Sequence, residues 1–349
     1  MPIVAAVVTA LTWGTKPASA VLVVAAALLG AAVLAAVHHA EVVAHRVGEP
    51  LGSLVLAVAV TVIEVALIVT LMVSGGKEAA TLARDTVFAA VMITCNGIVG
   101  LSLLSATLRH RTAVFNAEGT ASALATVATL TTLTLVVPRF TTSQPGPQFS
   151  SAQLTFAGVA SIVLYGLFVV VQTVRHRDDF MPVGTGGADS DPHLTPPPLR
   201  AALVSLGFLL VALVDVVGLA KLESKPIENA VTGIGAPLSA VGVVIALLVL
   251  APETLAAVRY ARRDRVQTSF NLAFGSAMAS IGLTIPVIAL ATIWLDTPLV
   301  LGLGATQMVL FALSIVVAAL TVLPGRATLQ EAGVHLVIFA AFVLLAFVP

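Results

Sequence analysis

Long apolar blocks fill most of the chain and are separated by short polar stretches. A helix needs about 20 mostly apolar residues to cross a bilayer, whereas barrel strands would alternate apolar and polar residues. The blocks do not alternate, so they predict an all-α integral membrane protein with about 11 transmembrane helices. The segments that reach or approach the required length are 2–14, 18–37, 51–73, 85–107, 119–137, 153–174, 200–220, 233–258, 267–292, 297–322 and 330–348.

The longest polar stretch divides these helices into two sets. Residues 175–199 hold four aspartates, several glycines and a run of prolines, which is the composition of a solvated linker. We therefore expect an extra N-terminal helix in 1–17, a five-helix repeat in 18–174 and a second five-helix repeat in 200–349. Two repeats with an odd number of helices, joined by one loop, have opposite orientations, so inverted repeats are predicted.

Lysines and arginines in the loops predict the orientation, because cytoplasmic loops carry the excess of positive charge. The side that bears the N-terminus has Arg46, Arg109, Arg111, Arg175, Arg177, Arg200, Arg259, Arg262, Arg263, Arg265 and Arg326. The opposite side has Lys16, Lys77, Arg84, Arg139, Lys221 and Lys225. We therefore expect the N-terminus and the Asp-rich linker in the cytoplasm and the C-terminus outside, in a bacterial-type inner (plasma) membrane.

Composition agrees with a lipid environment and excludes several functions. The chain is 58% hydrophobic and 10% charged, whereas soluble domains are about a quarter charged. Its 17 basic and 17 acidic residues cancel, which argues against a nucleic-acid partner because such proteins carry a basic surface. The single cysteine, Cys95, excludes an internal disulfide and a thiolate metal cage. The run after Met1 lacks the basic start of a cleaved signal, so a short first helix is expected.

Two glutamates stand out among the ionisable residues of the predicted spans. Glu64 lies near the middle of the third segment and Glu253 in the second half of the eighth, and each is the one acid in the middle of its span. Each also lies in the second helix of its five-helix half. Inverted repeats would therefore bring the two carboxylates together near the membrane midplane.

A facing pair of buried carboxylates is a natural site for a hard cation, which prefers oxygen ligands. Without a cation, burial and mutual repulsion favour proton uptake, and the pair titrates as one unit. A site that holds either Ca²⁺ or protons predicts an exchanger. The alternative is that each glutamate only hydrogen-bonds a neighbouring backbone group or hydroxyl.

The helix after each glutamate offers small polar residues that are candidate secondary ligands. These are Thr94, Asn96 and Ser102 after Glu64, and Ser269, Asn271, Ser276, Ser280 and Thr284 after Glu253. Small residues also allow helices to approach closely, which is the alternative role for them.

Four further residues are candidates for gating or pH sensing: His39, His45, Glu228 and His335. His39 and His45 belong to a charged cluster expected in the loop before the third span, where a purely solvated loop is the alternative. His335 could relay protons or form a buried hydrogen bond. Asp215, toward the end of the seventh predicted span, is expected to lie at the membrane edge or in an ion pair.

Enzyme signatures are absent from the sequence. HExxH, GxSxG, Walker and GxGxxG motifs in their required contexts do not occur. A membrane-embedded hydrolase is therefore disfavoured for want of a nucleophile motif, and no cofactor is expected. The partners expected are inorganic cations, protons and the lipid bilayer, with the oligomeric state left open.

Four stretches resemble the ChaA-type calcium/cation–proton antiporters of the cation/Ca²⁺ exchanger superfamily: HHAEVVAHRVGEPLGSLVLAVAVTVIEVALI, RDTVFAAVMITCNGIVGLSLL, PIENAVTGIGAPLSAVGVVIALLVLAPETLAAV and VQTSFNLAFGSAMASIGLTIP. The resemblance covers nearly the whole chain. It implies eleven helices, two α-repeats with an essential glutamate each, at Glu64 and Glu253, and export of cations from the cytoplasm against proton influx.

The sequence also departs from the vacuolar-type relatives in that superfamily. Thr61 stands where their first repeat has an asparagine, and Leu250 where the second has one. Ser276 keeps its place 22 residues after the second-repeat glutamate, as Gly-Ser does there, and Ser280 lies near the position of a glutamine. We therefore include Thr61 among the secondary ligands, and the small number of amide ligands leaves the cation open.

The leading functional prediction is Ca²⁺/H⁺ antiport by alternating access, which exports cytoplasmic Ca²⁺ with the proton gradient. Na⁺(K⁺)/H⁺ antiport at the same acid pair is the close alternative. A passive cation channel is disfavoured, because channels are more often oligomers with repeated pore elements.

Overall fold

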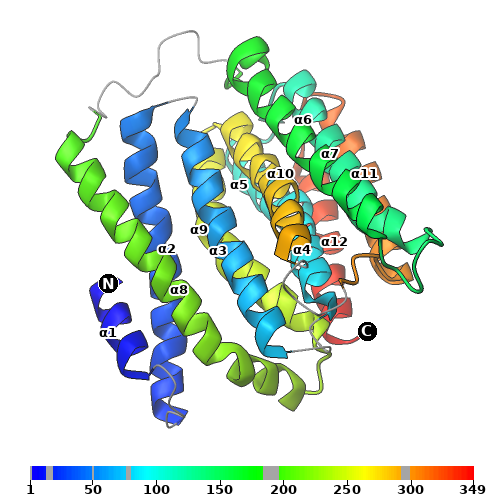
Figure 1. Ribbon diagram of the computed structural model, residues 1–349. Coiled ribbons are helices and arrows are strands. Elements are labelled where there is room, and N and C mark those ends of the chain that lie inside the picture. The colour runs from blue at the N-terminus through cyan, green and yellow to red at the C-terminus, as the bar shows by residue number, and fades with distance from the viewer. Residues whose placement is uncertain (1, 13–18, 49–50, 76–79, 184–195, 292–298) are drawn as a thin grey trace.

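The computed structural model describes residues 2–12, 19–48, 51–75, 80–183, 196–291 and 299–349. Within these ranges the chain is almost entirely helical (Figure 1). The α-helices are α1 (Pro2–Thr12), α2 (Ser19–Val47), α3 (Leu51–Gly75), α4 (Leu82–Met92), α5 (Val99–His110), α6 (Ala117–Thr131), α7 (Ser151–Val170), α8 (Leu199–Gly233), α9 (Ser239–Arg262), α10 (Val266–Ala291), α11 (Ala305–Val322) and α12 (Leu329–Phe347).

Shorter elements extend or connect these helices. The π-helices are η2 (Ile93–Ile98), η3 (Thr132–Val136) and η5 (Val171–Arg175), and the 3₁₀ turns are η4 (Val137–Arg139) and η6 (Arg177–Phe180). Two short strands, β1 (Ala113–Val114) and β2 (Arg326–Ala327), pair antiparallel and join the connection after α5 to the one before α12.

Nine helices in the described ranges are long and apolar enough to cross a membrane. They are Ala20–Val47, Leu82–His110, Ala117–Arg139, Ser151–Arg175, Leu199–Glu223, Ser239–Arg262, Val266–Ala291, Ala305–Val322 and Leu329–Phe347. The apolar stretches Pro2–Thr12 and Val58–Thr70 are shorter. Each segment predicted from hydropathy overlaps one of these helices, which agrees with an all-helical membrane protein; the total of eleven crossings stays a prediction.

Three predicted boundaries are wrong. The charged cluster before the third span is helical, because α2 continues to Val47 and ends at Gly48, which has φ +78°. No glycine or proline interrupts the sequence from His38 to Val47, so the helix continues through polar residues. Likewise α8 runs on to Gly233 through Pro226, and α11 begins at Ala305 after a non-helical stretch, 299–304.

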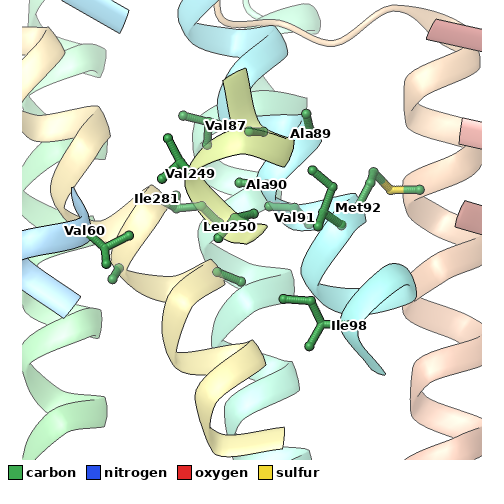
Figure 2. Packing of buried hydrophobic residues seen from close by; sticks show 14 of the residues in the cluster. Val60, Val87, Ala89, Ala90, Val91, Met92, Ile98, Val249, Leu250 and Ile281 are labelled. Atoms are coloured by element: carbon green, nitrogen blue, oxygen red, sulfur yellow. The ribbon is translucent and has the colours of Figure 1, made fainter. Parts of the chain in front are cut away.

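The helix Leu82–His110, formed by α4, η2 and α5, lies at the centre of the bundle. In the most apolar 18-residue stretch of this helix, 89% of the residues are buried. The corresponding share for the helix Ser151–Arg175 is 28%. Figure 2 shows Met92 and Ile98 of this helix among Leu250 of α9 and Ile281 of α10, all at most 2% exposed.

Other helices surround this centre. α8 packs along α2 and α3 with α1 beside it, and α6, α7 and α11 lie on the opposite side (Figure 1). α9 approaches α4 so closely that a Cβ on Gly242 would lie 2.8 Å from the backbone nitrogen of Thr86. A glycine is required there, since a side chain would collide with backbone.

Candidate functional site

Glu64 lies on α3, inside the bundle, with 2% of its surface exposed. Its Oε2 accepts a hydrogen bond of 2.5 Å from the Ser280 hydroxyl on α10. Its Oε1 is buried and has no hydrogen-bond partner. One oxygen of this carboxylate is therefore held in place while the other remains free for a ligand.

Glu253 repeats this arrangement on α9. It is 5% exposed, and its Oε1 accepts a hydrogen bond of 3.1 Å from Ser276 on α10. Its Oε2 is buried without a partner. Pro252 precedes it inside the helix, and because proline has no N–H, the carbonyl of Leu248 lacks its usual helical donor.

One turn of α10 links the two glutamates. Ser276 and Ser280 are four residues apart and therefore neighbours on one face of the helix, about 6 Å from each other. Each donates to a different glutamate, so the two carboxylates lie beside neighbouring positions of α10. The second helix of each predicted repeat thus places its glutamate against the same turn of α10.

The charge of this pair has no basic counterpart among the described residues. No ion pair with Glu64 or Glu253 occurs in the part of the chain that the structure describes. Two unpaired buried carboxylates are costly when ionised, so the pair must be neutralised by protons or by a cation. Two carboxylates and two hydroxyls form an oxygen-only ligand set, which suits Na⁺, K⁺ or Ca²⁺.

Several of the other predicted secondary ligands are hydrogen-bonded elsewhere. Thr94 donates to the carbonyl of Ala90 at 2.8 Å on its own helix. Asn271 donates to the carbonyl of Phe180 at 2.7 Å, near the start of the linker. Thr61 is 5% exposed and lies one turn before Glu64 on α3.

Asn96 belongs to a separate buried network with His335. The Asn96 amide donates to Ser314 of α11 at 2.9 Å, and its carbonyl oxygen lies 3.3 Å from His335 Nδ1. Nε2 of His335 lies 3.1 Å from the Thr321 hydroxyl. His335 therefore connects α12 to η2 and α11, and its side chain is fully occupied by these contacts.

The remaining candidates for gating lie on α2 and α8. His39 is partly buried and stacks on Phe208 of α8, with ring centroids 5.2 Å apart. His45 is exposed in the last turn of α2, and Glu228 is partly buried on α8 beyond the end of the apolar span at Glu223. Their roles in gating or pH sensing stay predictions.

Two further hydroxyls lie beside the site helices, and the sequence had identified one of them, Thr284. Thr284 follows Ser280 by four residues on α10 and continues the row of Ser276 and Ser280, and its hydroxyl is buried without a partner. Thr86 on α4 is likewise buried without a partner for its hydroxyl. Thr284 belongs to the polar cluster expected after Glu253, whereas Thr86 was not identified from the sequence.

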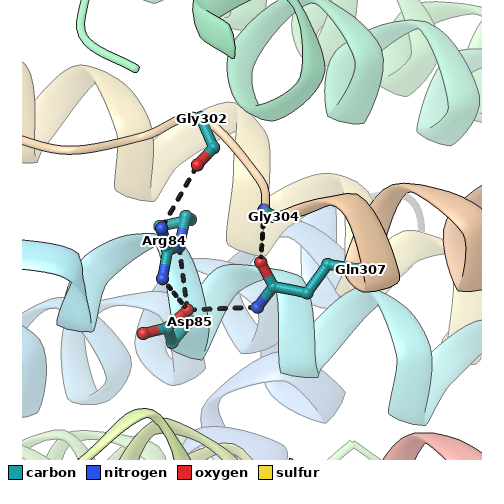
Figure 3. A network of polar contacts seen from close by, with 5 residues as sticks. All are labelled: Arg84, Asp85, Gly302, Gly304 and Gln307. Carbon is teal, nitrogen blue, oxygen red and sulfur yellow. Dashed lines mark hydrogen bonds and ion pairs between the residues drawn. The ribbon is translucent and has the colours of Figure 1, made fainter. Parts of the chain in front are cut away.

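Sequence reasoning also missed an ion pair between the partly buried Arg84 and the buried Asp85 at the start of α4. Arg84 contacts Asp85 Oδ1 at 2.8 Å and donates to the carbonyl of Gly302 at 3.2 Å. Gln307 of α11 donates to the same Asp85 oxygen at 3.2 Å, and its own carbonyl accepts from the backbone of Gly304 (Figure 3). This network fixes the segment before α11 against the start of the central helix.

Within the described ranges, no group of three or more His, Cys, Asp and Glu side chains forms a metal cluster. Any bound cation at the acid pair would therefore depend on two carboxylates, with hydroxyl and backbone oxygens or water as further ligands.

Comparison with known proteins identifies the family. Residues 18–174 and 204–348 match the family described as "Sodium/calcium exchanger protein". The chain is 46% identical to protein y4hA of Sinorhizobium fredii (strain NBRC 101917 / NGR234) over 328 residues, which cover 94% of this chain and 89% of that protein. It is 34% identical to the Sodium-potassium/proton antiporter ChaA of Escherichia coli (strain K12), with 99% of this chain and 94% of that protein covered.

The fold agrees with a solved structure. Native YfkE superposes with a TM-score of 0.73 at 16% identity and covers 100% of this chain and 97% of its own. The architecture is thus shared far beyond the similarity of sequence. With a family match over most of its length and a named antiporter at 34% identity, the chain belongs to the sodium/calcium exchanger protein family, whose members are membrane-spanning cation antiporters.

Proposed function

We propose that this chain is a cation/proton antiporter whose Glu64–Glu253 pair binds either a cation or protons. The observation that carries the proposal is the pair of buried carboxylates on one turn of α10, each with one oxygen bonded to a serine and one oxygen free. A site that is neutral with either occupant and costly when empty couples the two fluxes. In alternating access, proton influx drives cation export from the cytoplasm.

Ca²⁺ is the cation that the charge of the site favours. Two carboxylates carry two negative charges, which one Ca²⁺ or two protons neutralise, and Ca²⁺ accepts carboxylate and hydroxyl oxygens. The proposed ligands are Glu64, Glu253, Ser276 and Ser280. Thr61 is the next candidate by position, whereas Thr94, Asn96 and Asn271 would first have to leave their present partners.

Na⁺(K⁺)/H⁺ antiport is the second candidate, and the 34% identity to the Sodium-potassium/proton antiporter ChaA favours it. At a monovalent cation the same pair would keep one proton, so that the site remains neutral. The lack of amide ligands at the carboxylates also suits a less selective site.

We further propose an arrangement of one extra helix, in 1–17, and two inverted five-helix repeats, in 18–174 and 200–349, joined by the linker 175–199. In support, α3 and α9 bring equivalent acids to one place, and the family matches in two segments on either side of the linker. The arginine distribution supports a cytoplasmic N-terminus and linker, with the C-terminus outside, in the inner (plasma) membrane.

The test is transport in proteoliposomes with an imposed pH gradient. Ca²⁺, Na⁺ and K⁺ are added separately, and collapse of the gradient is followed with a pH-sensitive dye. Collapse by Ca²⁺ supports Ca²⁺/H⁺ antiport, and collapse by Na⁺ or K⁺ alone supports the second candidate. Cation flux that does not depend on the pH gradient would instead indicate a passive channel and contradict the proposal.

A further inference from the structure

We propose that Asp215 on α8 is a further proton-binding residue of the transport cycle, and that His39 on α2 passes protons between Asp215 and the end of the bundle where α2 terminates. This inference rests on the proton-coupled exchange proposed above. It adds residues on a pair of helices, α2 and α8, that contribute nothing to the acid pair.

Asp215 is a buried acid, and the ion pair that the sequence offered as one expectation for it is not observed among the described residues. It is 2% exposed, its Oδ2 has no hydrogen-bond partner, and it lies within the span Leu199–Glu223. An ionised carboxylate in such a place is costly without a partner, and acids retained there usually have a function in transport. Uptake of a proton removes the charge.

The helices packed against α8 offer no basic residue near the middle of the span. α1 contains no ionisable side chain, and the one ionisable residue of α3 is Glu64. α9 contributes Glu253 and, in its last turn, Arg259 and Arg262. No ion pair of Asp215 exists in the described ranges.

α8 itself places its basic residues away from Asp215. Between Arg200 and Lys221 it has no lysine or arginine. Glu223, two turns beyond Asp215, is also buried with Oε1 unpartnered, but it ends the apolar span and lies beside Lys221 and Lys225 in the sequence. Along the sequence of α8, Asp215 is therefore the acid farthest from a lysine or arginine.

The ionisable groups of α2 all lie in its last ten residues: His38, His39, Glu41, His45 and Arg46. His39 is the one whose ring touches α8, through the stack on Phe208, and its Nδ1 is buried without a partner. His38 is exposed, and its ring centroid lies 5.4 Å from that of His39. The pair thus connects the outside of the bundle with the α2–α8 interface.

The positions of His39 and Asp215 along the helices place His39 between Asp215 and the end of the bundle where α2 terminates. Phe208 precedes Asp215 by seven residues, or about 10 Å on one face of α8, so His39 lies about two turns nearer the start of that helix. Asp215 is about 24 Å from the start of α8, and Glu64 about 20 Å from the start of α3 at the same end. Asp215 therefore lies about as far along its helix as Glu64 does along α3, and the proposed transfer to His39 crosses about two helical turns.

The test separates proton transfer from cation binding in one preparation. Proteoliposomes with wild type, Asp215→Asn, Asp215→Glu and His39→Gln are assayed for pH-driven cation flux at several pH values. They are also assayed for self-exchange of a radioactive cation at equal pH, which needs no proton. Glu118→Gln, an acid in the first turn of α6 far from α8 in sequence, is the matched control.

Asp215→Asn is expected to slow pH-driven flux at least about tenfold, as loss of a positioned proton carrier does, and to alter its pH profile. Self-exchange and the Glu118→Gln control should stay at the wild-type rate. Asp215→Glu should restore most of the flux, and His39→Gln should slow it less than Asp215→Asn. Unchanged flux in Asp215→Asn, or a parallel loss of flux and self-exchange, would overturn this inference alone; absence of pH-driven flux in the wild type would overturn the proposed function.

Discussion

The hydroxyl of Ser280 on α10 donates to the Glu64 carboxylate on α3 at 2.5 Å, across 216 positions of the sequence. This contact joins a helix of the first half of the chain to a helix of the second. Four residues earlier on α10, Ser276 makes the equivalent contact with Glu253. The site is therefore assembled on α10 and depends on how that helix is rotated.

Replacement of Ser280 by alanine should weaken cation binding without unfolding the protein. The change removes one oxygen ligand and the group that orients Glu64, and we expect the half-saturating cation concentration to rise about tenfold, or about 1.4 kcal/mol. Transport kinetics in proteoliposomes measure this. Ser161→Ala is the control, since the Ser161 hydroxyl is bonded to Ala157 on its own helix; equal effects of the two changes would count against a ligand role for Ser280.

The apparent cation affinity should fall as the pH is lowered on the cation-binding side. Protons compete for the same carboxylates, so each bound cation must release protons, and acid shifts the competition toward the protonated site. Displacement of one proton gives up to about a tenfold loss of affinity per pH unit, and displacement of two gives up to about a hundredfold. Half-saturating concentrations at three pH values test this, and a flat profile is inconsistent with a shared site.

Removal of Arg84 should destabilise the protein more than removal of both partners of its ion pair. Asp85 is buried, and Arg84→Gln leaves its charge with the Gln307 amide as its remaining side-chain donor among the described residues, at a cost of about 3–5 kcal/mol. Arg84→Gln combined with Asp85→Asn removes the charge as well and should recover much of the loss. Thermal unfolding midpoints in detergent measure the stability of the single and the double variant. Equal midpoints for the two variants would show that the unpaired charge of Asp85 does not cause the loss of stability.

Asn96 should contribute to stability rather than to cation binding. Asn96→Ala removes the partner of Ser314 and His335 in a fully buried network, which should cost about 1–3 kcal/mol. The half-saturating cation concentration should remain that of the wild type. A lower cation affinity at unchanged thermal stability would instead indicate that Asn96 is a ligand. In that case η2 would have to rotate during transport so that Asn96 reaches the cation.

The acid pair could be predicted from the sequence because its signal is strong. Glu64 and Glu253 are isolated charges in apolar segments at corresponding positions, and such charges are retained for function. Ser276 and Ser280 were also predictable, because their spacing places them on one face of a helix.

Other features have no comparable signal in the sequence. Asn96 lies in η2, and a π-helical turn shifts the faces of the helix that follows, so the direction of its side chain cannot be derived from spacing. Polar residues from His38 to Arg46 suggest a loop, yet they are compatible with helix and extend α2. The burial of Asp85 and Asp215 depends on neighbouring helices, which hydropathy along one chain does not identify.

The most direct measurement is pH-gradient collapse by cations in proteoliposomes that contain wild type, Glu64→Gln or Glu253→Gln. Glutamine keeps the size and the hydrogen bond to serine but removes the charge that must be exchanged between cation and protons. The account predicts that the wild type collapses the gradient and that neither variant does, although both fold. Normal transport by both variants would contradict the assignment of the acid pair as the site of exchange.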